Sequence, residues 1–156
     1  MKLKKTRTQI FLIAMAILLG ACQPADVRPG FWLSGELVKP PPTDWLFIED
    51  IEEIFIETNT WYLAPHSTTI WCVVFANRLY VGSYGDEKKT WENNVANDPE
   101  ARLGVSGKLY QVLVTPVTDE ELSKNIAVSY NNKYDMQEVF GDEIPGWWFY
   151  QVTLHP

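Results

Sequence analysis

The chain is poor in the residues from which metal sites and disulfide frameworks are built. Its 156 residues include two cysteines and two histidines. It has no Cys-x-x-Cys pair and no close carboxylate pair at ligand spacing, so a structural metal site is not expected. Repeats and low-complexity segments are also absent, and the length suits one domain with a sizeable core.

Basic residues are scarce beyond the N-terminus. The first 21 residues hold four of the 13 basic residues and none of the 20 acidic ones, so their removal would leave a net charge of −11. Such an acidic surface argues against nucleic acid and anionic lipid headgroups as partners.

No hydrophobic run at the N-terminus is long enough to cross a bilayer. Ile10 to Leu19 form a short apolar stretch, which follows a basic head (Lys2, Lys4, Lys5 and Arg7) and precedes the small residues Gly20 and Ala21. This pattern is typical of an export signal. The head has no twin arginine, which favours export of the unfolded chain and cofactor uptake outside the cytoplasm.

The segment Leu19-Gly20-Ala21-Cys22 resembles the lipobox of bacterial lipoproteins. The resemblance implies cleavage before Cys22, a diacylglycerol thioether on its sulfur and N-acylation by a fatty acid such as palmitate. Each buried CH₂ then contributes about 0.8 kcal/mol to attachment to the lipid bilayer. The alternatives are an ordinary signal peptide with a chance cysteine, or an uncleaved anchor. Gln23 in place of Asp favours an outer membrane, by the habit of lipoproteins.

These features divide the chain into a signal peptide (residues 1–21), a lipidated tether (22–29) and one domain (30–156). Once Cys22 is modified, Cys72 has no partner for an intrachain disulfide. Cys72 lies in an apolar run, where a small buried hydrophobe is expected and a reactive thiol is the alternative.

Alternating apolar residues and turn signals predict mainly strands in the domain. Two hairpins turn at Ala76-Asn77 and at Ser106-Gly107, where Asn and Gly tolerate positive φ. The expected strands are Phe31 to Val38, Ile51 to Thr60, Thr68 to Phe75, Arg78 to Tyr84, Ala101 to Val105, Lys108 to Val117 and Trp147 to Leu154.

Two helices are expected between the strands. The first runs from Thr90 to Asn97. The second begins at the capping-box sequence Thr118-Asp119-Glu120-Glu121 and carries an apolar line of Leu122, Ile126, Tyr130 and Tyr134. The order of elements predicts an α+β domain, mainly an antiparallel β-barrel with two or three short helices, since closing the sheet removes its edges.

The stretch from Thr68 to Val117 resembles the FMN-binding split-barrel superfamily, which includes the pyridoxamine 5′-phosphate oxidase-like proteins. The closest branch is the deazaflavin-dependent nitroreductase-like one. The resemblance rests on Thr69-Ile70-Trp71-Cys72-Val73-Val74, Arg78-Leu79-Tyr80-Val81, Ser83, Lys88-Lys89, Trp91-Glu92-Asn93-Asn94-Val95, Asn97-Asp98-Pro99 and Gly107-Lys108-Leu109-Tyr110. It implies a six-stranded split β-barrel that forms a homodimer, with FMN or a deazaflavin between the subunits.

The same resemblance assigns the site. Lys88 and Lys89 match the basic pair that faces the cofactor phosphate, next to the start of a helix. Ser67, Thr68 and Thr69 match positions whose hydroxyls and backbone approach the ring, and Trp71 and Trp91 could supply apolar walls. Ser83 is also assigned to the cofactor site. His66 would lie at the mouth of the pocket, as a candidate to contact substrate or ring.

Each assignment has a structural alternative. The lysines can be solvated beside Asp86 and Glu87, the tryptophans can be core, and His66 can be a loop residue bonded locally. The aromatic run 147–150 is interpreted as core on one face and subunit contact on the other. Three functions follow: a flavin- or deazaflavin-binding lipoprotein with oxidoreductase chemistry, a non-catalytic envelope lipoprotein that binds a small molecule or a protein, and a purely structural dimer.

Overall fold

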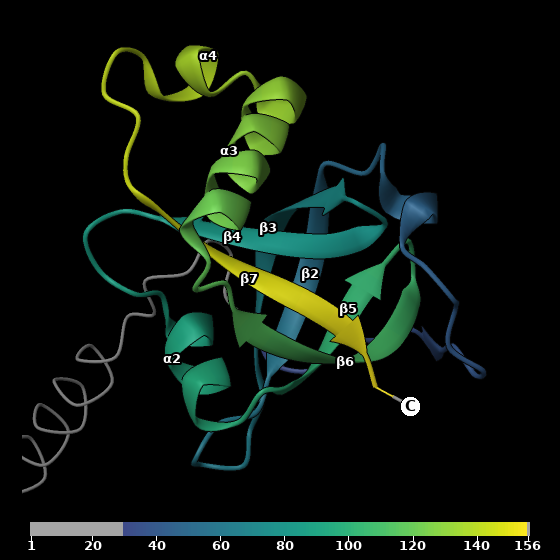
Figure 1. Cartoon of the computed structure of the whole chain (residues 1–156). Coiled ribbons are helices and arrows are strands. Elements are labelled where there is room, and N and C mark those ends of the chain that lie inside the picture. Colours follow the sequence, from purple (N-terminus) through teal and green to yellow (C-terminus); the bar gives the residue numbers. More distant parts are fainter. Residues whose placement is uncertain (1–29, 156) are drawn as a thin grey trace, which may run out of the picture.

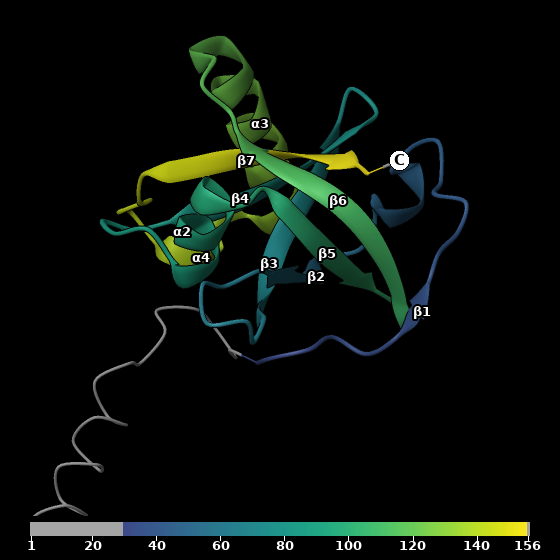
Figure 2. The same cartoon turned by 90° about the horizontal axis from the view of Figure 1, so that it is seen from below.

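The computed structural model describes residues 30–155, in which six antiparallel strands close into a barrel (Figures 1 and 2). The elements are β1 (Glu36–Leu37), the 3₁₀ turn η1 (Leu46–Ile48), β2 (Glu53–Thr58), β3 (His66–Phe75), β4 (Arg78–Tyr84), α2 (Thr90–Asn97), β5 (Glu100–Val105), β6 (Lys108–Pro116), α3 (Glu120–Tyr134), α4 (Met136–Phe140) and β7 (Trp147–Leu154). The predicted signal peptide, Cys22 and the tether lie outside the described residues.

The strands follow the order β6-β5-β2-β3-β4-β7, and β7 pairs back onto β6 to close the barrel. Both predicted hairpins are confirmed. Ala76 and Asn77 have φ of 51° and 62°, and Ser106 and Gly107 have φ of 49° and 78°. Two residues with positive φ give a turn whose twist matches that of the strands. The sequence prediction of a six-stranded α+β barrel is confirmed.

Two hydrophobic clusters stabilise the domain. The barrel interior holds side chains such as Ile54, Leu79 and Val112, together with Trp91 and Val95 of α2, which covers one end. The second cluster lies outside the barrel, where Ile126 and Tyr130 of α3 pack on β3, β4 and β7. Figure 1 shows α3 across this face and α2 at the barrel's lower end. No described helix has the length and apolarity needed to cross a membrane.

The predicted first strand, Phe31 to Val38, is wrong in most of its length. Only Glu36 and Leu37 pair as a strand, in parallel with the start of β6. Upstream, the backbone is held at separate points, because Gly30 exchanges two hydrogen bonds with Ser67 and the Leu33 N–H donates to Glu57. The segment therefore crosses the ends of several strands and finds no single neighbour to pair with.

Two smaller predictions also need correction. The capping-box sequence places the N-cap at Thr118, but α3 is capped by Asp119, whose Oδ1 accepts from the Leu122 N–H at 2.6 Å. The outward face of β7 was expected to contact a second subunit. Trp147 and Phe149 instead pack against α3, where the Tyr130 ring lies 5.2 Å from each. The same chain covers this face, since α3 supplies its own apolar line.

Candidate functional site

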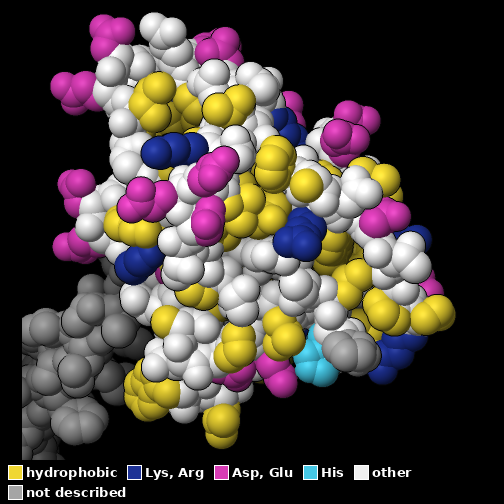
Figure 3. All heavy atoms as spheres, in the orientation of Figure 1, with side chains coloured by type: hydrophobic (Ala, Val, Ile, Leu, Met, Phe, Trp, Pro, Cys, Tyr) yellow, Lys and Arg dark blue, Asp and Glu magenta, His cyan; other side chains and the backbone are white. Residues whose placement is uncertain are grey.

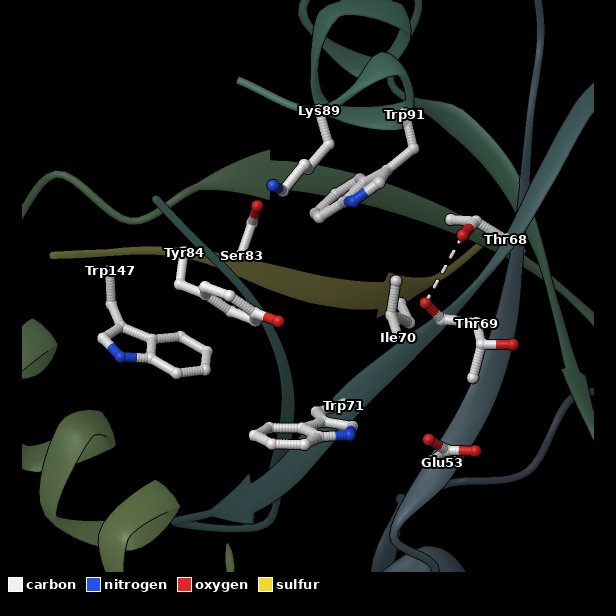
Figure 4. Close-up of a pocket in the computed structure, with 11 residues that line it drawn as sticks. Glu53, Thr68, Thr69, Ile70, Trp71, Ser83, Tyr84, Lys89, Trp91 and Trp147 are labelled. Carbon is white, nitrogen blue, oxygen red and sulfur yellow. Dashed lines mark hydrogen bonds between the residues drawn. The ribbon is translucent and has the colours of Figure 1, made fainter. Parts of the chain in front are cut away.

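The barrel opens where β3 and β4 separate. Their pairing runs from Phe75↔Arg78 to Trp71↔Gly82 and ends there. Beyond that point β3 continues beside β2 and β4 continues beside β7, so a wedge remains between them. A pocket of about 230 Å³ lies at this split, lined by Glu53, Thr68, Thr69, Ile70, Trp71, Gly82, Ser83, Tyr84, Lys89, Trp91 and Trp147 (Figure 4).

The edge of β3 that faces the pocket is unpaired at Thr69. The N–H and C=O of Ser67 bond Gly30, on the edge away from β2. Because these groups alternate along a strand, those of Thr69 point to the same edge, where β4 has already ended. The Thr69 carbonyl receives only a 3.5 Å contact from the Thr68 hydroxyl, and the Thr69 hydroxyl oxygen is buried without a partner among the described residues. Backbone groups with unused hydrogen-bonding capacity thus face the pocket.

Aromatic rings form the walls. The Trp71 and Trp147 rings lie 6.3 Å apart at 21°, and Tyr84 lies 5.2 Å from Trp147. The other face of Trp71 is stacked on Tyr134 at 4.6 Å and 8°. Since an added Cβ at Gly82 would lie 3.0 Å from atoms of both Trp147 and Tyr130, glycine allows these rings to close over β4. The result is a rigid apolar surface suited to a planar ring.

A buried carboxylate organises the side of the pocket formed by α2. The Glu92 side chain is fully buried and accepts hydrogen bonds from Ser83 Oγ at 2.6 Å, the Lys89 N–H at 2.8 Å, Tyr150 Oη at 2.7 Å and Lys88 Nζ at 3.2 Å. Burial, and then the bond to Glu92, raise the pKa of Tyr150 above its usual range. The four donors compensate a charge that would otherwise be costly to bury.

The two adjacent lysines have different environments. Lys88 contacts Glu92 and Tyr150, and its ammonium lies 4.1 Å from the centre of the Trp148 ring. Lys89 lines the pocket, with its ammonium 5.5 Å from the centre of the Tyr84 ring. Figure 4 shows Lys89 on the same side of the pocket as Ser83 and Trp91, opposite Trp71. Of the predicted basic pair, only Lys89 is placed to meet an anion in the pocket.

The contact with Glu92 fixes the direction in which the Ser83 hydroxyl donates its hydrogen bond. Its proton is directed at the Glu92 carboxylate, in a short charge-assisted hydrogen bond. The remaining lone pairs of the Ser83 oxygen are then available toward the pocket, so Ser83 is suited to accept from a ligand N–H or O–H.

The structure brings most of the predicted site residues together. Thr68, Thr69, Trp71, Ser83, Lys89 and Trp91 line one pocket. Lys88, Ser67 and His66 do not line it. The backbone N–H and C=O of Ser67 are hydrogen-bonded to Gly30. His66 is buried, and its carbonyl accepts a hydrogen bond from the Thr58 hydroxyl at 3.2 Å. The structure therefore does not place His66 at the mouth of the pocket.

Several residues that line or organise the site were not predicted. Tyr84 and Trp147 are cross-strand partners on the outward faces of β4 and β7. Their signal is the alternation Tyr80-Gly82-Tyr84, in which a small residue stands between two rings. Glu92 was part of the family pattern but had no assigned role. Its position three residues after the N-cap of α2 is a signal for capping, and its burial could not be read from the sequence.

Comparisons with known proteins agree with this architecture. A family model described as an uncharacterized protein conserved in bacteria (DUF2255) matches residues 47–144. No curated protein matches the chain.

Solved structures share the fold at low identity. A protein from Listeria innocua, provisionally described as a pyridoxamine 5′-phosphate oxidase, superposes with a TM-score of 0.52 at 14% identity, covering 70% of this chain and 88% of the other. A conserved hypothetical protein from Mycobacterium tuberculosis gives 0.52 at 15%, covering 76% and 87%. A FAD-binding protein from Mesorhizobium loti gives 0.50 at 10%, covering 70% and 85%. The likeness establishes the split-barrel fold, which the sequence resemblance had predicted.

Proposed function

Because this chain belongs to the DUF2255 family, whose description states no activity, we propose its function from its own site: the domain binds the planar ring of a flavin or deazaflavin in the split between β3 and β4. The observation that carries this proposal is the unpaired edge of β3 at Thr69, which faces a pocket walled by Trp71, Tyr84 and Trp147. A ring with donors and acceptors on its rim can pair with such an edge while its faces contact the aromatic side chains.

The residues fit the ring better than the whole cofactor. The volume of about 230 Å³ is below the range of about 300–1,000 Å³ that is typical of small-molecule sites. Lys89 is the lysine placed for a phosphate, and the Lys88 ammonium is already paired. We expect the ring to be enclosed and the phosphate to lie near the rim. A second subunit could complete the site, as the superfamily resemblance implies.

The roles of the side chains follow from their contacts. A bound flavin or deazaflavin would supply the electron or hydride transfer of an oxidoreductase. Ser83 accepts a hydrogen bond from the ring, the Thr69 peptide orients it, and Lys89 attracts negative charge. Trp91, which is buried at the end of the barrel, excludes water from the inner side.

A binding titration tests the ring site. Full-length protein is titrated with FMN and with riboflavin, which lacks the phosphate. Lys89→Ala should weaken FMN about 10-fold and leave riboflavin within about 2-fold, since only FMN uses the ammonium. Lys124→Ala, at an exposed position on α3, is the matched control. Absence of binding of both ligands and of a deazaflavin at about 50 μM would contradict the proposal.

The pocket also supports a second function, that of a non-catalytic binding module. Its small volume and its one inward lysine suit a planar aromatic molecule without a phosphate. Tight binding of riboflavin or a smaller heterocycle, with no gain for FMN and no reduction by any electron donor, would favour this module over an oxidoreductase.

We also propose that Cys22 is lipidated and that the domain stands at the envelope surface, with the outer membrane favoured where one exists. The support is the lipobox-like segment Leu19 to Cys22. Mass spectrometry of the membrane fraction should give an N-terminal fragment that begins at Cys22 and carries acyl chains. A fragment with unmodified Cys22 would contradict the anchor and leave the ring site untouched.

A further inference from the structure

Large apolar side chains are exposed at one end of the β2–β3 hairpin. Trp61 and Leu63 on the connecting loop are 91% and 92% exposed. Phe31 and Trp32, at the beginning of the described chain, are 62% and 67% exposed, and Tyr62 is 48% exposed. We call these five residues the hairpin-end patch. Exposed apolar groups on this scale are uncommon unless they meet a partner.

The patch is held where the chain enters the fold. Gly30 pairs with Ser67 just after the loop, and the Leu33 N–H donates to Glu57 near the end of β2. Glu57 is fixed in turn by two 2.8 Å hydrogen bonds from Arg102. Phe31 and Trp32 lie between these two attachment points. Figure 3 shows hydrophobic side chains over the β2–β3 loop at the lower edge of the domain, and Figure 2 shows this loop close to the first of the described residues.

The patch is electrically neutral in an acidic protein. Residues 30–35 and 58–65 contain no charged side chain, although the chain has 20 acidic residues. A partner selected by charge is therefore not indicated. Trp and Tyr together with aliphatic groups are instead the combination found at the interface between lipid and water.

We infer that the hairpin-end patch docks on the surface of the bilayer that holds the proposed lipid anchor, with Trp61 and Leu63 in the interfacial layer. The inference rests on the proposed lipidation of Cys22. From Cys22 to Gly30 there are eight residue steps, which at about 3.6 Å each allow at most about 29 Å. The anchor thus keeps this end of the domain within reach of the membrane. The absence of basic residues favours zwitterionic over anionic lipid.

Cysteine labelling tests the docking. The variants Leu63→Cys and Val128→Cys place a thiol in the patch and on α3, at side chains that are 92% and 59% exposed. Native Cys72 is buried, and its thiol pKa is raised to about 11, so it reacts slowly. The mature lipoprotein is added to preformed phosphatidylcholine vesicles and labelled with a charged maleimide. The labelling rate of each variant on vesicles is divided by the labelling rate of the same variant unfolded in urea.

On vesicles, we expect Leu63→Cys to react at least about 10-fold more slowly than Val128→Cys. Equal rates would overturn the docking surface while leaving the anchor intact. Protection of Leu63→Cys that comes with cross-linking of two copies by a bis-maleimide would assign the patch to self-association and overturn the proposal. If the protein does not float with the vesicles and Cys22 itself is labelled by the maleimide, both the anchor and the docking are overturned.

Discussion

Strand β3 extends past a neighbouring strand in both directions, and the backbone groups left unpaired in the two places have different surroundings. Near Cys72 it passes the start of β2, which pairs no further than Glu53↔Trp71. Near Thr69 it passes the end of β4, which pairs no further than Trp71↔Gly82. We call these the closed end and the open end, because side chains of α3 cover the first and a pocket faces the second.

At the closed end, side chains satisfy the backbone groups that the sheet leaves unpaired. The Tyr134 hydroxyl accepts from the Cys72 N–H at 2.9 Å, and its one proton is within donating distance of the carbonyls of Glu52 and Cys72, at 2.6 and 2.7 Å. Lys133 Nζ donates to the carbonyls of Cys72 and Ile51 at 2.9 and 2.6 Å. Burial raises the pKa of Tyr134 above its usual range.

At the open end, no helix side chain in residues 30–155 bonds to the unpaired backbone of β3, and the Thr69 carbonyl has a 3.5 Å contact from the neighbouring Thr68 hydroxyl. The Thr69 peptide faces a pocket of about 230 Å³, and the Thr69 hydroxyl has no partner within the described chain. Buried polar groups are nearly always satisfied, and this fold satisfies them at the other end of the same strand. This difference between the two ends is the observation that supports the proposed ring site.

The largest effect is expected at the carboxylate that holds α2 beside the open end. Glu92→Ala leaves Ser83, Tyr150 and the Lys89 N–H without their acceptor, and should lower the free energy of unfolding by about 3 kcal/mol or more. Urea unfolding of the variant and of the unchanged protein measures this loss of stability. Glu87→Ala, at an exposed position, is the control and should change stability by less than about 0.5 kcal/mol. Similar small losses for both variants would show that Glu92 does not organise the site.

Removing the Tyr134 hydroxyl, at the closed end, should lower the free energy of unfolding slightly less than Glu92→Ala does. Tyr134→Phe keeps the stacking on Trp71 but removes the partner of the Cys72 N–H and of the Glu52 carbonyl, while the Cys72 carbonyl keeps Lys133. It should destabilise by about 2 kcal/mol. Because Tyr134 does not line the pocket and the stacking on Trp71 is kept, riboflavin affinity should stay within about 2-fold. A variant that loses ring binding without losing stability would reverse the proposed roles of the two ends.

Stability at high pH provides a third contrast. Burial raises the pKa of Cys72 from 9.0 to about 11. Well below pH 9 the thiol is neutral in both states and contributes no pH dependence. Between about 9 and 11 the unfolded chain releases this proton while the folded chain keeps it, so stability falls as pH rises, by up to about 1.4 kcal/mol per pH unit.

Cys72→Ala should remove that part of the slope in urea unfolding at pH 8 to 10.5. Its lower stability from the lost side chain is a constant offset and does not affect the comparison of slopes. An unchanged slope would mean that the thiol titrates freely in the folded protein.

Local signals were sufficient to predict most of the fold. The turns at Ala76-Asn77 and Ser106-Gly107 and the apolar line of α3 depend on neighbours in sequence, and all were predicted. The segment 31–38 was not, because its alternation resembles a strand while its real contacts are separate points on Ser67, Glu57 and β6.

The candidate site was predicted in composition but not in orientation. Thr68, Thr69 and Lys89, which the family resemblance selected, line the pocket, and their role toward a cofactor stays a prediction. It could not separate Lys89 from Lys88, because which of two adjacent lysines turns inward depends on Glu92 and on Tyr150, which is distant in sequence. Pairing across such separations is set by packing, which one sequence does not reveal.

The smallest expected effect is at the open end itself. Thr69→Val replaces an unpartnered hydroxyl by a methyl of similar shape, and should leave stability unchanged or raise it by about 0.5 kcal/mol. Thermal unfolding checks this. If the hydroxyl contacts the ring, the same variant should weaken riboflavin a few-fold, so that stability and binding change in opposite directions. A loss of stability above about 1 kcal/mol would show that the hydroxyl is already satisfied.

The most direct test of the account is amide hydrogen exchange at Thr69 and Cys72, followed by NMR with and without saturating riboflavin. The Cys72 amide is bonded to Tyr134 and should be protected in both states. The Thr69 amide should exchange rapidly in the free protein and at least about 10-fold more slowly with the ring bound. A Thr69 amide that is protected without ligand, or whose exchange does not change on binding, would contradict the claim that the open edge of β3 is the ring site.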